Sequence, residues 1–283
     1  MRGDKKIAIE PAVQHADSLR ALALRRNPLV HQGLSVFLYD LLPGKWGDDA
    51  ITRGWIAYAN GELQQAADAF GRAVARDPKK FGYLRYNRAS ALLNLQRVDS
   101  AAAELATLLA QLREQDSATV GQGYQSKELL EYAAGMLNML QRRTAEAKQS
   151  FARSVTENPG FVPAHAMLGD LALQKKDTTS ALLEYATAVE IDPSDVMLRL
   201  GYGKVLLAAG RSKDAVTQMR AAVALEPFFA AAYFRLGNAL EVSGDTKAAT
   251  AAYAQFVARA PREDPLRAQA EEVLKILSAP NDF

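Results

Sequence analysis

The sequence predicts an all-α protein built from repeated pairs of helices, and three regular features of the chain predict it. Prolines stand at positions 159, 193, 227 and 261, each 34 residues after the previous one. Glycines keep the same spacing at 135, 169, 203 and 237, and an alanine follows each of them after 12 residues. Between these positions apolar residues recur every three or four places, which is typical of amphipathic helices. A fixed period of this length indicates a repeat array.

Each period is expected to contain two helices joined by a polar turn. In one period the apolar spacing predicts helices over 162–174 and 178–191, with Asp177 as the N-cap of the second. The glycine of the first helix and the alanine of the second are small where two helices must cross closely. A large residue four places after the alanine, such as Tyr185, is expected to fill the space beside the crossing. Proline ends the pair, because it cannot continue a helix and it biases the preceding residue away from helical geometry.

The same interpretation divides the whole chain into predicted segments. Residues 1–46 are expected to form an N-terminal helical cap or a degenerate repeat, split at Asn27-Pro28. In the second repeat Arg113 stands where the proline should be. After the last repeat, Asp264 and Pro265 predict the start of a capping helix within 264–283. Between these ends, residues 47–263 hold six predicted units and one insertion: 47–80, 82–115, the insertion 116–127, 128–161, 162–195, 196–229 and 230–263.

Composition excludes several classes of protein. The 283 residues carry a net charge of +2, which gives no electrostatic reason to expect nucleic-acid binding. The chain contains no cysteine, so disulfides and thiolate metal sites are excluded. No apolar run of about 18 residues is present, so no membrane span is expected. We expect a bacterial protein of the cytoplasm or periplasm, from which a leader or anchor could have been removed.

Motifs of catalysis are weak. The histidines, His15, His31 and His165, are dispersed and are expected to be structural rather than metal ligands. Gly121, Gly123 and Lys127 in the insertion match neither a dinucleotide fingerprint nor a phosphate loop. We therefore expect no enzyme activity, no cofactor and no metal.

The Gly…Ala…large apolar…Pro pattern over residues 47–263 resembles the tetratricopeptide repeat (TPR) family. The resemblance implies a right-handed α-solenoid whose concave surface is lined by the first helix of each pair, three residues before, one after and four after the repeated glycine. Arg235 lies on the same helices, two residues before a glycine. The candidate partner-binding residues are Trp55, Tyr58, Tyr86, Tyr132, Met136, Met139, Asp170, Lys204, Arg235 and Asn238.

The candidates differ between the two halves of the array. Those of the first three units are aromatic or thioether side chains, which suit an apolar helix or an extended peptide. Those of the last three units are polar and of mixed charge, and are expected to orient the ligand. The alternative is that the aromatic residues pack between neighbouring repeats or are covered by the N-terminal helices. Two TPR specialisations are disfavoured: Ile51 and Trp55 stand where a carboxylate clamp needs Lys and Asn, and Asn87 alone makes no asparagine ladder.

The sequence thus predicts a non-catalytic scaffold that binds a peptide or helix of a partner protein in its concave groove and supports a larger assembly. Two alternatives stay open. One is a permanently bound structural subunit of a large assembly, such as one at the cell envelope. The other is a TPR segment of a secretion or export system. The partner and the oligomeric state are not determined by the sequence.

Overall fold

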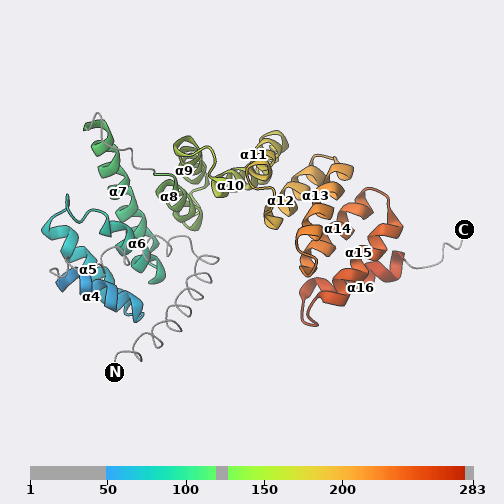
Figure 1. Ribbon diagram of the computed structural model, residues 1–283, viewed down its shortest axis with the longest axis horizontal. Helices are drawn as coiled ribbons and strands as arrows, with labels where there is room; N and C mark the ends of the chain where they lie inside the picture. The colour runs from blue at the N-terminus through green and yellow to red at the C-terminus, as the bar shows by residue number, and fades with distance from the viewer. Residues whose placement is uncertain (1–48, 119–126, 278–283) are drawn as a thin grey trace, which may run out of the picture. The chain divides into compact units, whose positions relative to one another are not determined.

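The computed structural model describes residues 49–118 and 127–277, and in these residues all regular structure is helical (Figure 1). The prediction of an all-α array of helix–turn–helix units is confirmed. The predicted N-terminal region 1–46, His15, His31, most of the insertion and the last residues of the tail lie outside the described residues. Within the described ranges, every helix is too short or too polar to cross a bilayer.

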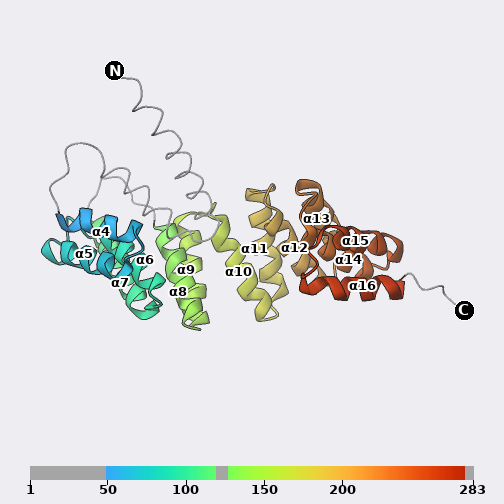
Figure 2. The same cartoon turned by 90° about the horizontal axis from the view of Figure 1, so that it is seen from below.

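The helices follow one another in pairs, and the two helices of each pair are joined by a short turn (Figures 1 and 2). The pairs are α4 (Asp49–Ala59) with α5 (Leu63–Arg76), α6 (Leu84–Asn94) with α7 (Val98–Ala118), α8 (Glu128–Leu140) with α9 (Thr144–Glu157), α10 (Val162–Gln174) with α11 (Thr178–Ile191), α12 (Val196–Ala208) with α13 (Ser212–Leu225), and α14 (Ala230–Val242) with α15 (Thr246–Arg259). The helix α16 (Pro265–Leu277) follows the last pair and packs on α15.

The contacts divide the chain into two compact units, with the boundary between Ser150 and Phe151 inside α9. Unit 1 has a core in which Phe70, Leu84 and Leu105 are fully buried. Unit 2 has a core around Met219 and Phe256, which are also fully buried. In each unit the core lies between successive helices of the stack, as expected when a repeat cannot bury its apolar face alone.

The closest packing within a pair is between the repeated glycine and the large side chain of the second helix. A Cβ added to Gly54 would lie 2.7 Å from the ring of Phe70. One added to Gly237 would lie 2.8 Å from the ring of Tyr253. Carbon atoms cannot approach this closely without displacement, so only glycine allows the two helices to cross at this separation. The predicted role of the glycine is confirmed.

Tyr185 shows a second contact of this kind that the 34-residue spacing did not predict. Its ring lies against Gly169 of its own pair, where a Cβ would be 2.6 Å away. On its other side lies Gly201 of the next pair, where a Cβ would be 2.4 Å away. The ring is therefore inserted between α10 and α12. Gly201 is needed for the close contact between neighbouring pairs, and Gly169 is needed for the close contact within one pair.

The helix starts are stabilised by aspartates at the predicted places. Asp177 accepts a hydrogen bond of 3.0 Å from the backbone N–H of Ser180 at the start of α11. Asp264 accepts one of 2.9 Å from the backbone N–H of Leu266 at the start of α16. Both predicted caps are confirmed, and each satisfies a backbone donor that has no partner within its own helix.

The turns after Pro159, Pro193 and Pro227 share a further contact that the sequence did not predict. The proline carbonyl accepts a hydrogen bond from the fourth residue of the next unit. The carbonyl oxygen of Pro159 lies 2.9 Å from Nε2 of His165, and that of Pro193 accepts a bond of 2.8 Å from Nε of Arg199. Pro227 accepts a bond of 3.1 Å from the hydroxyl of Tyr233. These bonds join the end of one pair to the start of the next, and so help to set the angle between them.

Two of these donors also contact the second helix of their own unit. Nδ1 of His165 lies 2.7 Å from the carboxylate of Glu184, and Arg199 donates a bond of 3.0 Å to Gln218. His165 is buried, and both of its ring nitrogens have partners within the protein. The structure therefore gives this histidine a structural place, as expected for it from the sequence.

The second pair departs from the pattern where Arg113 replaces the proline. With no proline to end it, α7 extends over 21 residues to Ala118, so the first three residues of the predicted insertion continue the helix. Arg113 forms an ion pair with Glu131 of α8, whose side chain is fully buried. An ionic contact to the next helix is thus present where other units have a proline turn.

Replacing glycine by alanine in two equivalent positions tests the close crossing. In Gly237→Ala the new methyl group meets the rigid ring of Tyr253, and we expect the free energy of unfolding to fall by about 1–3 kcal/mol. In Gly203→Ala it meets Cε and Cγ of Met219 at 2.9 and 3.0 Å, and this unbranched side chain can change rotamer. Alanine also gains about 1 kcal/mol of helix propensity over glycine, so this variant is expected to be near wild type. Urea denaturation of the two variants measures the difference, and equal stabilities would contradict the explanation.

Candidate partner-binding surface

In unit 2 the first helices of the pairs form a layer of their own. Besides its own partner α13, α12 contacts both α10 and α14. Helices on the inner side of a curved stack lie closer together than those on the outer side, so this contact indicates that α10, α12 and α14 form the inner, concave layer. The side chains that these three helices leave exposed are the candidates for contact with a partner.

Two basic side chains and an amide on this layer are exposed: Lys204 on α12, and Arg235 and Asn238 on α14. Within the described residues, none of these three side chains forms a hydrogen bond or an ion pair. Their polar groups are therefore available to a ligand.

Two carboxylates on the same layer are held in place by tyrosines of the second helices. The hydroxyl of Tyr185 donates a hydrogen bond of 2.9 Å to Asp170, and that of Tyr253 donates one of 2.9 Å to Glu241. Burial raises the pKa of both tyrosines, and the neighbouring carboxylate adds to the shift in each case. Neither carboxylate forms an ion pair with a basic side chain of the described residues, so both can accept bonds from a ligand.

In unit 1 the structure separates the aromatic candidates into buried and accessible ones. Trp55 and Tyr86 are only 7% and 5% exposed and belong to the core. Trp55 packs edge-on against Phe70, with ring centroids 5.1 Å apart. Burial, followed by the nearby Tyr58, raises the pKa of Tyr86. Both side chains are buried in the core, and Trp55 packs within its own pair, whereas the alternative interpretation expected packing between neighbouring repeats.

The other aromatic and thioether candidates of unit 1 are half-buried. Tyr58 shares a hydrogen bond of 2.8 Å with the hydroxyl of Ser90 on α6. On α8, Tyr132, Met136 and Met139 keep part of their surface exposed, and burial raises the pKa of Tyr132. Part of each side chain therefore remains for contact with a partner.

The comparison with family models decides the family. The model described as "Tetratricopeptide repeat" matches residues 51–117, 132–196 and 200–264, which together are well over half of the chain. The chain belongs to the tetratricopeptide repeat family. TPR proteins generally mediate protein–protein interactions, and the TPR fold is typically non-catalytic. No curated protein matches the chain.

Solved TPR structures share the fold at low sequence identity. YrrB, described as a TPR protein with an unusual peptide-binding site, is 23% identical, with a TM-score of 0.57 over 73% of this chain and 100% of that one. The C-terminal part of a TPR repeat-containing protein from Cytophaga hutchinsonii is 14% identical, with a TM-score of 0.62 over 82% of this chain and 96% of that one. MamA is 15% identical, with a TM-score of 0.52 over 62% of this chain and 94% of that one.

Tyr185 and Tyr253 are the residues of this TPR surface that the sequence analysis missed. The sequence indicates only a space-filling role for them, because the same repeat position holds apolar Phe151 and Met219 in other units. A signal was present in the sequence: tyrosine takes this position only in the two units whose first helix places a carboxylate, Asp170 or Glu241, on the concave stripe.

The described residues hold no cluster of three or more His, Cys, Asp or Glu side chains that could bind a metal ion. The polar groups of the first-helix layer are instead single side chains spread over three helices. This arrangement suits the recognition of several groups along an extended ligand.

Replacing Tyr185 by phenylalanine tests the bond to Asp170. We expect the free energy of unfolding at pH 8 to fall by about 1–2 kcal/mol, because a hydrogen bond to a charged group is lost. Because folding raises the pKa of Tyr185, its hydroxyl stabilises the fold fully below about pH 10, the ordinary pKa of tyrosine. This stabilisation is lost as the pH rises above that value, because the unfolded chain then releases the proton more readily. The variant should therefore lose less stability than wild type between pH 8 and pH 11 in urea denaturation. An identical pH dependence in the two proteins would contradict this assignment.

Proposed function

We propose that this TPR protein is a non-catalytic scaffold that binds an extended segment of a partner protein along the first helices of unit 2. One observation carries the proposal. The basic side chains Lys204 and Arg235 have no partner among the described residues, while the carboxylates of Asp170 and Glu241 are fixed by buried tyrosines.

The order of charges on this surface suggests the kind of segment that would bind. Along the stack the groups are acidic at Asp170, basic at Lys204 and Arg235, and acidic at Glu241. A segment with acidic side chains flanked by basic ones would meet opposite charges at each step, which gives selectivity and correct register. Because the tyrosines already orient the carboxylates, less conformational freedom is lost on binding.

Unit 1, taken by itself, is proposed to contribute apolar contacts. The half-buried Tyr58, Tyr132, Met136 and Met139 combine aromatic area with flexible thioethers, which adapt to apolar side chains of a partner. Trp55 and Tyr86 are proposed to act indirectly, by packing beneath this surface. The peptide-binding site named for YrrB supports the use of this fold for peptide recognition.

A charge-reversal experiment tests the proposed surface of unit 2. The full chain is used to capture partners from the cells that make it, beside the variant Lys204→Glu/Arg235→Glu. The matched control is Lys213→Glu/Arg220→Glu, which makes the same change at exposed positions of the second helix α13. A partner that binds wild type and the control is expected to be lost from the first variant, because two attractive contacts become repulsive.

Thermal melts of all three proteins show whether folding is retained, which is expected because the four replaced side chains are exposed. A partner that binds all three proteins equally, or that is lost from both variants, would contradict a role for the first-helix surface.

A further inference from the structure

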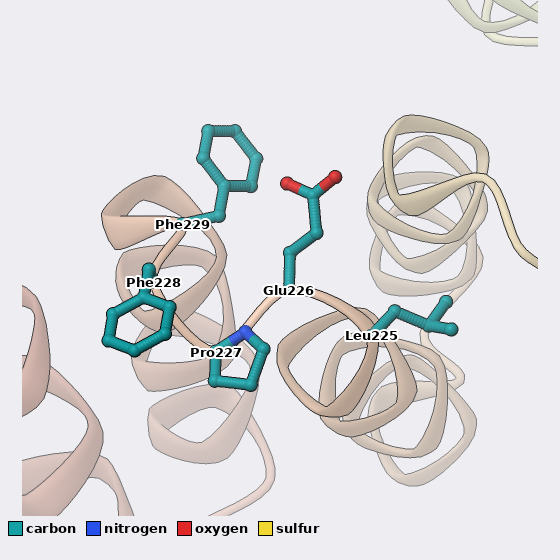
Figure 3. A pocket seen from close by; sticks show the side chains of 5 residues that line it. All are labelled: Leu225, Glu226, Pro227, Phe228 and Phe229. Atoms are coloured by element: carbon teal, nitrogen blue, oxygen red, sulfur yellow. The ribbon is translucent and has the colours of Figure 1, made fainter.

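The turn between α13 and α14, residues Leu225–Phe229, differs from the other turns in the residue before its proline. In three other turns this residue is Asp or Asn, and its side chain accepts backbone N–H bonds of 2.9–3.2 Å within the turn; the three are Asp77, Asn158 and Asp192. In this turn the residue is Glu226, whose side chain forms no hydrogen bond or ion pair with a described residue. Its carboxylate therefore stays available at the surface, beside an open pocket formed by the turn (Figure 3).

The same turn exposes an aromatic ring. Phe228 follows the proline and is 90% exposed, whereas the equivalent positions in the two preceding turns hold Gly160 and Ser194. In Figure 3 the ring of Phe228 and the carboxylate of Glu226 point in different directions from the turn. An exposed phenylalanine in a turn that elsewhere is small and polar breaks the local pattern, and such departures tend to mark functional positions.

Phe228 belongs to a larger apolar surface, the turn-edge patch, which we define as Ile191, Met197, Leu225 and Phe228. The other three residues are 41%, 64% and 43% exposed. The start of α12 lies beside the end of α13 because the two helices pack as an antiparallel pair, and α13 packs in turn on α14. The patch therefore runs across the adjoining ends of four helices. Each of the four side chains keeps at least 41% of its surface exposed.

The charges around the turn-edge patch are mainly acidic. Glu190 and Glu226 are exposed, and neither side chain is paired with a described residue. Asp192 and Asp195 lie in the turn between Ile191 and Met197, and the bonds from Ser194 hold the pKa of Asp192 below its ordinary value. Glu190, Asp192 and Asp195 make the patch acidic on its α11–α12 side, and Glu226 makes it acidic at the turn before α14. Together these carboxylates form its acidic rim.

Two arginines beside the patch, Arg199 and Arg259, are held by neutral groups and keep their positive charge, so they are outnumbered by the four carboxylates rather than neutralised. Arg199 is bonded to Pro193 and Gln218. Arg259 is bonded to the carbonyl of Pro227 and lies over the ring of Tyr233, 4.5 Å from its centroid. Two further basic side chains are exposed. The charge of Arg262 is offset by the adjacent Glu263, and Arg220 points about 140° away from Leu225 around α13.

We propose that the turn-edge patch binds a basic amphipathic segment of a partner protein, with its apolar side chains against Phe228 and Leu225 and its Lys or Arg side chains facing Glu190 and Glu226. Burying the exposed apolar side chains drives the association, and the acidic rim selects a basic segment over an acidic one. This surface consists of turns and helix ends. Met197 lies about two turns before Lys204 on the same face of α12, so the patch adjoins the polar surface proposed above at this helix, whereas Leu225, Phe228, Glu190 and Glu226 lie outside the first helices.

A peptide of defined design tests the proposal on the full chain. The probe is a fluorescent helical peptide of about 18 residues, with Leu at the i, i+3, i+4 and i+7 positions and Lys elsewhere. A second peptide has Glu in place of every Lys. Binding is measured by fluorescence anisotropy for wild type, for Leu225→Ala/Phe228→Ala and for Glu190→Lys/Glu226→Lys.

The matched controls are Leu183→Ala/Val242→Ala, which removes exposed apolar side chains outside the patch, and Glu146→Lys/Glu272→Lys, which reverses two exposed carboxylates on α9 and α16. We expect the lysine peptide to bind wild type and both controls alike, and each patch variant to bind it about tenfold more weakly or worse. The glutamate peptide should not bind. Melts of the variants should match wild type, because all the replaced side chains are exposed.

The proposal is overturned if the controls lose as much affinity as the patch variants, or if the glutamate peptide binds as well as the lysine peptide. It is also overturned if light scattering shows a dimer that dissociates in the Leu225→Ala/Phe228→Ala variant, because a second copy would then be the occupant of the patch. The Lys204→Glu/Arg235→Glu variant distinguishes this proposal from the proposed function. If that variant loses its cellular partner but still binds the lysine peptide, the two surfaces act independently.

Discussion

The contact between a glycine of one helix and a large side chain of the next is the constraint on which the described repeats depend. In α4–α5, α10–α11, α12–α13 and α14–α15 the space beside the glycine is already occupied by Phe70, Tyr185, Met219 or Tyr253. Beside the rigid rings of Phe70, Tyr185 and Tyr253 the helices can therefore cross only where a Cβ is absent, whereas the flexible Met219 can give way to one. Because the same two positions meet in each of these pairs, the pairs share one geometry, and copies of one geometry stack into a regular array.

This packing also builds the candidate binding surface. A ring that enters from the second helix and passes beside a glycine ends close to the exposed side of the first helix. When the ring is a tyrosine, its hydroxyl reaches a carboxylate there, as Tyr185 reaches Asp170 and Tyr253 reaches Glu241. One side chain thus fills the core and orients a surface group, so stability and recognition are coupled in these two units.

In three connections between pairs, the fourth residue of the next unit makes the same hydrogen bond although its side chain differs. His165, Arg199 and Tyr233 all bond to the preceding proline carbonyl, which any side chain of suitable length with an N–H or O–H group can do. The turns themselves are less uniform. Arg113 replaces a proline and pairs with Glu131, and the Glu226–Phe229 turn leaves a carboxylate and an aromatic ring at the surface. The regular contacts hold the array together, and the irregular ones distinguish this chain from a generic repeat.

The sequence by itself determined the helices, their pairing and the close crossings. Periodic signals such as Gly237 and Pro227 depend on local backbone geometry and on a contact repeated at fixed spacing, and both can be read from one chain. It also placed Lys204, Arg235 and Asn238 on exposed positions of the first helices. Only the tertiary structure showed that Trp55 and Tyr86 are buried, that Gly201 receives the ring of Tyr185, and that His165, Arg199 and Tyr233 bond to the preceding proline carbonyl. These features depend on which side chains of neighbouring helices approach one another, and side chains of different chemical type can meet the same geometric need.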